Sequence, residues 1–377
     1  MALYAADERS TKIDLGVGVF RDAQGRSPII AAVAAAEAEI ARTETTKSYL
    51  PLRGHDGFLA RMRELILAEP ADQRISALQC VGGTGGVYLG LALAAMANPA
   101  MKVIIGTPTW PNHIAICDQL GLPVLPFRYY DVASQRVLIE NLHDAIRNGR
   151  PGDVLILHGP CHNPTGADLD WPTLEATLEL ASRHGMIPLV DAAYYGLNGG
   201  LENDIALMRR IMAAAPEAML VISCSKMFSL YRERTGVLFI AASNAAAAAI
   251  AQANAERIAR CCYSMPPAHG AATVALVLER SSFHRQWRAE VEDMRLRLQD
   301  VRADLATQGS DITALGAVIR QRGIFSLLPI SPTVVNAMAR EHGIYMPQSG
   351  RINIAGFKQG DVTRFTDALR SVLARSA

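Results

Sequence analysis

Short apolar runs in the middle of the chain alternate with longer segments in which apolar residues recur at helical spacing. The short runs are residues 102–106, 153–158, 187–191, 219–222 and 237–240, and such runs are typical of buried strands. The longer segments are residues 28–42, 58–67, 87–96, 241–260 and 282–308. This alternation predicts an α/β fold in which helices cover both faces of a mainly parallel sheet.

Polar residues stand at the ends of four of these predicted strands. They are Thr107, His158, Asp191 and Ser223. Ligands of open parallel sheets bind at the carboxyl ends of the strands. We therefore expect these four side chains to converge on one site.

The two ends of the chain have a different pattern from the middle. Short strand patterns occupy residues 12–22, 323–328 and 351–354, and a helical pattern covers residues 362–375. A chain of 377 residues is also long for a single compact core. We predict a large domain of residues 28–293 and a smaller α+β domain formed by residues 1–27 and 294–377.

Composition and charge exclude several classes of protein. Half of the residues are hydrophobic and 19% are charged, which is typical of a well-buried globular chain. The net charge of +1 gives no electrostatic reason to expect nucleic acid or an anionic membrane as a partner. We find no transmembrane run, no secretory signal and no zinc-ligand spacing among the six cysteines, so we expect reduced thiols, no metal and a cytoplasmic location.

Lys226 is the strongest candidate for a chemical role. The chain has five lysines, at positions 12, 47, 102, 226 and 358, and only Lys226 follows a buried strand within a serine-rich loop. Ser223, Ser225 and Arg234 around it could hold a phosphate while the lysine presents its amine. That combination is what a pyridoxal phosphate enzyme needs for its Schiff-base lysine and its phosphate anchor. Taken alone, a surface lysine in a turn after a strand explains the same residues about as well.

A glycine-rich segment, residues 82–86 (GGTGG), opens the helical pattern of residues 87–96. Such a turn exposes backbone N–H groups to an anion at the start of a helix, where the helix dipole also favours negative charge. The signal is weak by itself, because glycine-rich turns are common and this one lacks the spacing of a dinucleotide or Walker motif.

Nine segments taken together resemble the class I (subgroup Iα) aminotransferases, the aspartate and aromatic amino acid aminotransferase family. In chain order they are TKSYLPLRG, GGTGG, PTWPNH, CHNPTGADL, DAAYYG, SCSKMFSLYRERTG, RCCYSMPPAHGA, QRGIFS and SGRINIAG. The resemblance implies pyridoxal phosphate transferase fold type I with a seven-stranded sheet. It also implies a homodimer with shared active sites, and transfer of an amino group from aspartate or an aromatic amino acid to 2-oxoglutarate by a ping-pong mechanism.

The resemblance also implies roles for residues around the cofactor ring. Lys226 would carry the cofactor and then move the substrate's α-proton as a base. Asp191 would pair with the pyridine nitrogen, His113 would hydrogen-bond Asp191, and Trp110 would stack on the ring. Asn163 and Tyr194 would hydrogen-bond the ring's phenolic oxygen. Without the resemblance, Asp191 also fits a helix N-cap, His113 a core histidine and Trp110 core packing.

The remaining roles concern the phosphate and the substrate. The phosphate would be bound by Gly83, Thr84, Ser223, Ser225 and Arg234, together with Tyr49 from the neighbouring subunit. Arg351 would bind the substrate's α-carboxylate, and Arg260 from the partner would bind a distal carboxylate. Gly18, Trp110 and Asn163 would also face the substrate. A solvated arginine at a helix end is the plain alternative for Arg260.

Met265 departs from the family pattern, which usually has asparagine or serine before the Pro-Pro pair. A thioether cannot replace the hydrogen bonds of those side chains. This leaves open a pyridoxal phosphate enzyme that acts on an unusual amino acid by transamination, β-elimination or decarboxylation. A non-catalytic protein that binds pyridoxal phosphate is a remote third hypothesis.

Overall fold

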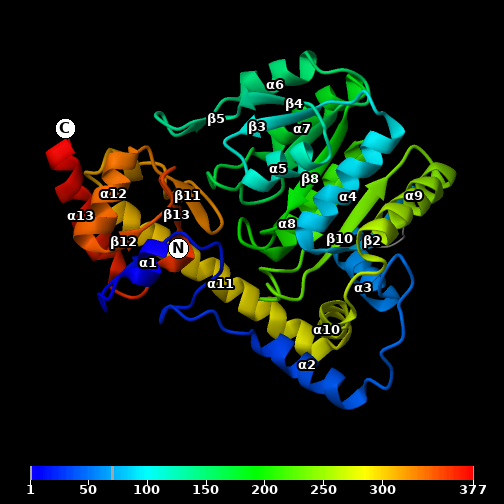
Figure 1. The fold of residues 1–377 in the computed structure, drawn as a ribbon, viewed down its shortest axis with the longest axis horizontal. Coiled ribbons are helices and arrows are strands. Elements are labelled where there is room, and N and C mark those ends of the chain that lie inside the picture. Colours follow the sequence, from blue (N-terminus) through cyan, green and yellow to red (C-terminus); the bar gives the residue numbers. More distant parts are fainter. Residues whose placement is uncertain (1, 69–71, 377) are drawn as a thin grey trace.

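The computed structural model describes residues 2–68 and 72–376 of the 377-residue chain and is built around one large sheet (Figure 1). Within the described residues this sheet has seven strands. In spatial order they are β2 (Ile75–Val81), β10 (Thr235–Ala241), β9 (Ala218–Ser223), β8 (Ile187–Ala192), β7 (Val154–His158), β3 (Val103–Thr107) and β4 (Val124–Arg128). β10 is antiparallel to both its neighbours, and the other neighbouring pairs are parallel. The predicted α/β class and mainly parallel seven-stranded sheet are confirmed.

Helices cover both faces of this sheet (Figure 1). Successive strand residues point to opposite faces, so Val221 of β9 enters one hydrophobic core and Leu220 the other. The first face is covered by α4 (Gly82–Ala97), α5 (Pro111–Gln119) and α9 (Ala245–Tyr263). The second core includes residues of α2 (Ala31–Thr43), α3 (Asp56–Leu67), α6 (Ile139–Arg147), α7 (Trp171–Arg183), α8 (Leu201–Ala214), α10 (Ala268–Glu279) and α11 (Ser281–Gln308).

The two ends of the chain lie side by side at one end of the molecule (Figure 1). β1 (Ile13–Asp14) pairs in parallel with β12 (Ile344–Tyr345), and β11 (Phe325–Leu327) pairs antiparallel with β13 (Arg351–Asn353). The other elements are α1 (Ala2–Ala6), β5 (Tyr130–Asp131), β6 (Arg136–Val137), η1 (Thr313–Leu315), α12 (Pro332–His342), η2 (Ile354–Gly356) and α13 (Asp361–Ser376). No helix of the described residues combines the length and apolarity that crossing a membrane requires.

Helix α11 connects this end of the molecule to the large sheet. It contacts α2 and α10 along its first part and α13 and η2 along its last part. It also runs without a break through residues 293 and 294, where we predicted the domain boundary. The division into residues 28–293 and residues 1–27 with 294–377 stays a prediction, and its first and last residues lie outside the described part of the chain.

Most predicted elements are present with shifted ends, and three predictions need correction. The strand pattern of residues 12–22 forms a strand only at Ile13–Asp14. The helical segment 241–260 begins four residues late, because Ala241 pairs with Ile75 in the sheet and the Asn244 side chain caps α9. The glycines of residues 82–86 form the first turn of α4 instead of preceding it.

Candidate active site

A cavity of about 160 Å³ lies at the carboxyl ends of β7, β8 and β9. His158, Asp191 and Ser223, three of the four polar residues that follow the predicted strands, line it. Thr107 does not, because its hydroxyl turns to the neighbouring strand and donates to the Phe127 carbonyl at 3.0 Å. Among the described residues, the lining consists of Gly83, Thr84, Trp110, His158, Cys161, Asn163, Asp191, Ala193, Tyr194, Ser223, Ser225, Lys226 and Arg234.

Lys226 presents its amine in surroundings that disfavour its charge. The residue lies three positions after the end of β9, in a connection whose other end begins β10, so the sheet anchors both ends of this segment. The Nζ atom lies 4.9 Å from the centre of the Tyr194 ring. Burial lowers the pKa of Lys226 below its ordinary value, although the Asp191 carboxylate acts in the opposite direction. A larger fraction of the amine is therefore neutral and able to accept a proton.

Asp191 is held as a carboxylate by a chain of hydrogen bonds. His113 Nε2 lies 3.1 Å from Asp191 Oδ2, and His113 Nδ1 lies 2.8 Å from the Thr109 hydroxyl. That hydroxyl is also 3.0 Å from His158 Nε2. Burial acts to raise the pKa of Asp191, but the bond to His113 and the positive charges around it hold that pKa below its ordinary value.

The opposite wall of the cavity is built to hold an anion. The N-terminus of α4 supplies backbone N–H groups, and Gly83 packs against Ser223. Arg234 Nη1 donates to Ser225 Oγ at 3.3 Å, and the Ser223 hydroxyl lies 3.2 Å from the Ser225 hydroxyl. Two hydroxyls, a guanidinium and a helix N-terminus together match the donors that a phosphate group requires.

Polar atoms without partners point to a ligand between these two walls. Asn163 Oδ1 and Asp191 Oδ1 are buried and have no hydrogen-bond partner within the described residues. Buried polar oxygens are normally paired, so each is available to a bound group. Trp110 lines the same space, with its ring edge-on to that of His113 at 5.3 Å. Burial raises the pKa of Tyr194 well above its ordinary value, so its hydroxyl stays protonated as a donor.

Arg351 and Gly18 lie beside this cavity, around the ring of Phe325. The Arg351 guanidinium is 4.3 Å from the centre of that ring, and one of its amino groups donates to the Gly16 carbonyl at 2.9 Å. Its Nε is buried and has no partner among the described residues. A side chain at Gly18 would lie 3.0 Å from the same ring. Burial lowers the pKa of Arg351, and nearby Tyr194 opposes this.

Two further predicted residues lie on the surface, outside the lining of this cavity. Tyr49 is 91% exposed, and Arg260 is exposed on the last turn of α9. The segments that carry them are nevertheless joined, because the Leu50 N–H lies 3.2 Å from the Met265 sulfur. The resemblance implies that both residues belong to the site of a neighbouring subunit.

The structure adds residues that the motif comparison did not assign. Thr109 and His158 extend the hydrogen-bonded chain behind Asp191, and Cys161 lines the cavity. The strand-end pattern predicts His158, whereas no pattern singles out Thr109 within the PTWPNH segment. Burial lowers the pKa of His158 well below its ordinary value, so the chain ends in a neutral imidazole.

The fold and this cavity together define an α/β enzyme of pyridoxal phosphate transferase fold type I. Candidate ring-binding groups, an anion cup and a buried amine meet at the carboxyl ends of the strands, and the unpartnered Oδ1 of Asp191 is an acceptor that fits the protonated ring nitrogen of the cofactor. The solved aromatic amino acid aminotransferase from Burkholderia pseudomallei, described as covalently bound to pyridoxal phosphate, has the same fold. It is 32% identical to this chain, with a TM-score of 0.95 and coverage of 99% of this chain and 95% of the other.

The chain belongs to the aminotransferase class I and II family, whose model matches residues 10–369. It is 42% identical to the aromatic-amino-acid aminotransferase of Paracoccus denitrificans, over 99% of this chain and 95% of that relative. It is 35% identical to the aspartate aminotransferase of Haemophilus influenzae, over 98% and 95% of the two chains. The resemblance is thereby confirmed: the protein is a pyridoxal phosphate-dependent aminotransferase that acts on amino acids.

Proposed function

We propose that this enzyme moves the amino group of aspartate, of aromatic amino acids, or of both to 2-oxoglutarate by a ping-pong mechanism. The observation that carries the proposal is the meeting of Lys226, Asp191 and the Ser223–Ser225–Arg234 cup around one cavity. The names of the relatives support both classes of donor. In a ping-pong mechanism, the first 2-oxo acid leaves before the second one enters.

The lining of the cavity supports a role for each residue toward the cofactor. Asp191 would hold the pyridine nitrogen, and Trp110 would cover the ring. Asn163 and Tyr194 would hydrogen-bond the phenolic oxygen. The α4 N-terminus would hold the phosphate together with Gly83, Thr84, Ser223, Ser225 and Arg234. Bound in this way, the cofactor supplies a carbonyl that exchanges the amino group and a ring that accepts the electron pair of the substrate's α-carbon.

Lys226 acts as the base in this proposal. Its lowered pKa makes the neutral amine available to take the proton from the α-carbon of the amino acid and to return it to the cofactor side. Asp191 remains a carboxylate, and it would hold a proton on the pyridine nitrogen of a bound cofactor. His113 and Thr109 fix the direction of that carboxylate.

Arg351 binds the α-carboxylate of the substrate in this proposal. A guanidinium offers paired N–H donors, and the unpartnered Nε is one of those available. Gly18 leaves room for the substrate over Phe325, where a larger side chain would meet the ring. Trp110 and Asn163 border the same space.

We also propose a homodimer in which each site is completed by a second copy of the chain. Tyr49 reaches the phosphate and Arg260 reaches the distal carboxylate of the neighbouring site. The exposure of both side chains supports this, as does the contact between Leu50 and Met265 that holds their segments together.

The two-domain division is supported by the pairing of β1 with β12. A cytoplasmic location is supported by six free cysteines.

The first test is an absorbance titration of the purified, cofactor-loaded enzyme with aspartate, glutamate, tyrosine and phenylalanine in turn. We expect at least aspartate or one aromatic amino acid to convert the cofactor to its amine form and to release one equivalent of 2-oxo acid. Adding 2-oxoglutarate afterwards should restore the original spectrum. An enzyme that none of the four amino acids converts would contradict the proposal.

Met265 favours a second candidate, an enzyme of a specialised pathway with a less polar substrate. Its sulfur is already engaged with the Leu50 N–H and offers no strong donor or acceptor to a distal carboxylate.

Met265→Asn should raise kcat/KM for aspartate relative to phenylalanine, by about tenfold if one hydrogen bond to a charged group is gained. The ratio is measured by steady-state kinetics with both donors. An unchanged ratio would show that Met265 does not select the substrate.

A further inference from the structure

The loop that carries Asn163 is built around a carboxylate outside the proposed machinery, that of Asp168. The Cys161 N–H donates to Asp168 Oδ2 at 2.8 Å, and the His162 N–H donates to Asp168 Oδ1 at 2.7 Å. Each carboxylate oxygen therefore receives one of two consecutive backbone donors. No lysine or arginine of the described residues forms a salt bridge with Asp168 (the carboxylate's polar partners are these backbone groups).

The backbone at this point has the shape of an anion-binding nest. Cys161 has φ of +71°, a left-handed conformation that residues other than glycine rarely adopt. Consecutive N–H groups next to such a residue converge on one point and bind anions. Here the anion is a side chain of the same loop. The acceptor compensates for the unfavourable conformation of Cys161.

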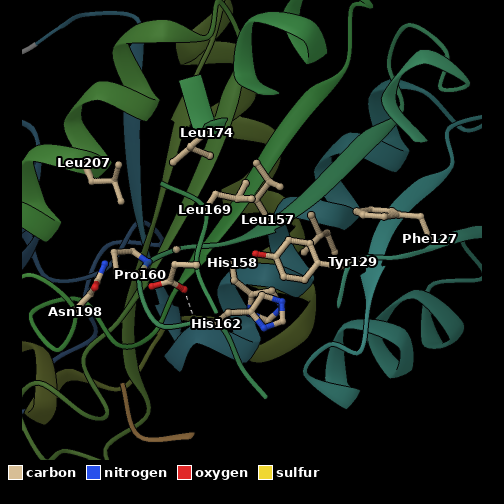
Figure 2. A pocket seen from close by; sticks show the side chains of 14 residues that line it. Phe127, Tyr129, Leu157, His158, Pro160, His162, Leu169, Leu174, Asn198 and Leu207 are labelled. Carbon is tan, nitrogen blue, oxygen red and sulfur yellow. Dashed lines mark hydrogen bonds between the residues drawn. The ribbon is translucent and has the colours of Figure 1, made fainter. Parts of the chain in front are cut away.

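Asn163 follows the nest directly, so the position of its amide depends on this loop. His162 is fixed as well, because its ring stacks on Tyr129 at 4.6 Å and its Nδ1 lies 2.9 Å from the Thr165 hydroxyl. His162, Tyr129, Leu169 and Leu174 line a cavity of about 40 Å³, and Figure 2 shows the His162 ring beside that of Tyr129. Asp168 also lines this cavity, behind the cofactor side of the loop.

The loop after the neighbouring strand β8 is also built around an internal carboxylate. Asp204 of α8 accepts N–H groups from Gly196, Asn198 and Gly199 at 2.7, 3.1 and 3.0 Å. That turn follows Tyr194, the other residue proposed to meet the phenolic oxygen. Gly196 has φ of +91°, which matches the left-handed residue of the first nest. Two neighbouring loops therefore each place a ring-binding side chain next to a nest closed by an internal carboxylate.

We propose that Asp168 is a positioning residue, which fills the nest of Cys161 and His162 and thereby holds the Asn163 amide against the phenolic oxygen of the cofactor. The inference rests on the proposed role of Asn163. Its predicted consequence is spectroscopic: a hydrogen bond from Asn163 favours the ionised phenolic oxygen and lowers the pH midpoint of the bound cofactor's visible absorbance.

The test is Asp168→Asn, with Asp170→Asn as the matched control. An amide has a single oxygen, so one of the two N–H groups would lose its acceptor and face an NH₂ group instead. Asp170 caps α7 by accepting the Thr173 N–H, a function that asparagine performs equally well. We expect Asp168→Asn to raise the pH midpoint by about one unit, toward the value of Asn163→Ala, and Asp170→Asn to leave it unchanged.

A double-mutant cycle separates positioning from a general loss of stability. In the Asn163→Ala background, Asp168→Asn should shift the midpoint no further, because the amide that it positions is absent. Additive shifts would overturn the proposal. So would an Asp168→Asn enzyme with lower thermal stability and an unchanged midpoint.

Two further outcomes concern the role of Asn163 itself and an Asp168 variant that does not fold. If Asn163→Ala itself leaves the midpoint unchanged, the proposed role of Asn163 is wrong and the inference falls with it, whatever Asp168→Asn does. If the Asp168 variant does not fold, hydrogen exchange of the loop's backbone amides is measured in the unmodified holoenzyme instead. Slow exchange of the Cys161 and His162 amides supports the nest, and exchange at the rate of an open loop overturns it.

Discussion

Lys226 combines a buried position with a neighbouring carboxylate. Burial alone would leave a neutral lysine, and Asp191 alone would leave a charged one. The outcome is an amine whose pKa is lowered but which still has an anion close by. A base of this kind can accept the proton of the substrate's α-carbon and release it again, which a repeated proton transfer requires.

Lys226→Ala should therefore abolish both covalent attachment of the cofactor and the proton transfer. We expect kcat to fall by about 10²–10⁴ or more, the usual contribution of a positioned acid–base group. Borohydride treatment followed by mass spectrometry should find no cofactor on the variant chain.

Lys102→Ala is the control for that experiment. Lys102 precedes β3, at the opposite end of the sheet from the cavity, and its loss should leave attachment and rate unchanged. A Lys226 variant that keeps the attached cofactor would assign the Schiff base to another lysine.

At the scale of elements, the first turn of α4 explains why glycine stands at the anion cup. Gly82 has φ of +66°, and a Cβ atom there would lie 2.4 Å from Arg234 Nη2. The helix can start against the guanidinium only because this side chain is missing. The cup depends on both elements, the helix N-terminus and the segment before β10.

Gly82→Ala should weaken cofactor binding by displacing Arg234. Loss of one charge-assisted hydrogen bond costs about 1.5–3 kcal/mol, so we expect the dissociation constant of pyridoxal phosphate to rise by about 10- to 100-fold. Fluorescence titration of the apoenzyme measures this.

Gly121→Ala isolates backbone strain from the clash with the arginine. Gly121 has nearly the same φ, +65°, but nothing within 4 Å of the added Cβ. The Gly121→Ala substitution should lower the thermal stability of the enzyme and leave its affinity for the cofactor unchanged. Equal losses of affinity in both variants would remove Arg234 from the explanation.

Strands with long apolar runs could be predicted from the sequence, whereas a strand whose run is interrupted by a buried polar residue could not. β9 was found because its strand residues up to Ile222 are apolar, whereas β2 was not assigned although its side chains are almost all buried. Gln79 interrupts the pattern of β2, and it is tolerated because its amide bonds the His55 N–H and the Pro267 carbonyl. Such partners come from distant segments, and periodicity alone does not reveal them.

The candidate site divides in the same way. The strand-end rule placed His158, Asp191 and Ser223 in one cavity, and family motifs supplied Trp110, Asn163 and Tyr194. The nest around Asp168 depends on a left-handed backbone conformation at Cys161, and the conformational preference of cysteine does not predict it.

For the whole molecule, buried histidines should make stability fall in acid. Burial, with nearby His113 acting in the same direction, lowers the pKa of His162 to about 3, and burial lowers that of His158 well below its ordinary value. Below pH 6.5 these two histidines bind protons in the unfolded chain but stay neutral in the folded chain. The free energy of unfolding therefore decreases with falling pH, by up to about 1.4 kcal/mol per pH unit for each histidine.

His162→Asn removes one of these groups. Between pH 6.5 and pH 5 the variant should lose about 2 kcal/mol less unfolding free energy than the unmodified enzyme. Urea unfolding at the two pH values measures the difference. Equal losses in both proteins would show that His162 is protonated in the folded state.

Shared active sites can be tested by mixing two inactive variants. Lys226→Ala and Arg260→Leu homodimers should both transaminate aspartate poorly, whereas a hybrid dimer contains one site with both residues intact. After random exchange, about half of the dimers are hybrids and half of their sites are complete, so activity should return to about a quarter of normal. A mixture that stays inactive would show that both residues serve the same chain's site.

Helix α11 has a mechanical consequence for the far end of the molecule. Its 28 residues span about 42 Å, so a tilt of about 3° at one end moves the other end by about 2 Å. That displacement is enough to make or break a hydrogen bond. Because α11 contacts η2, and η2 directly follows the strand β13 that carries Arg351, such a tilt beside α2 and α10 would move Arg351 relative to the cavity.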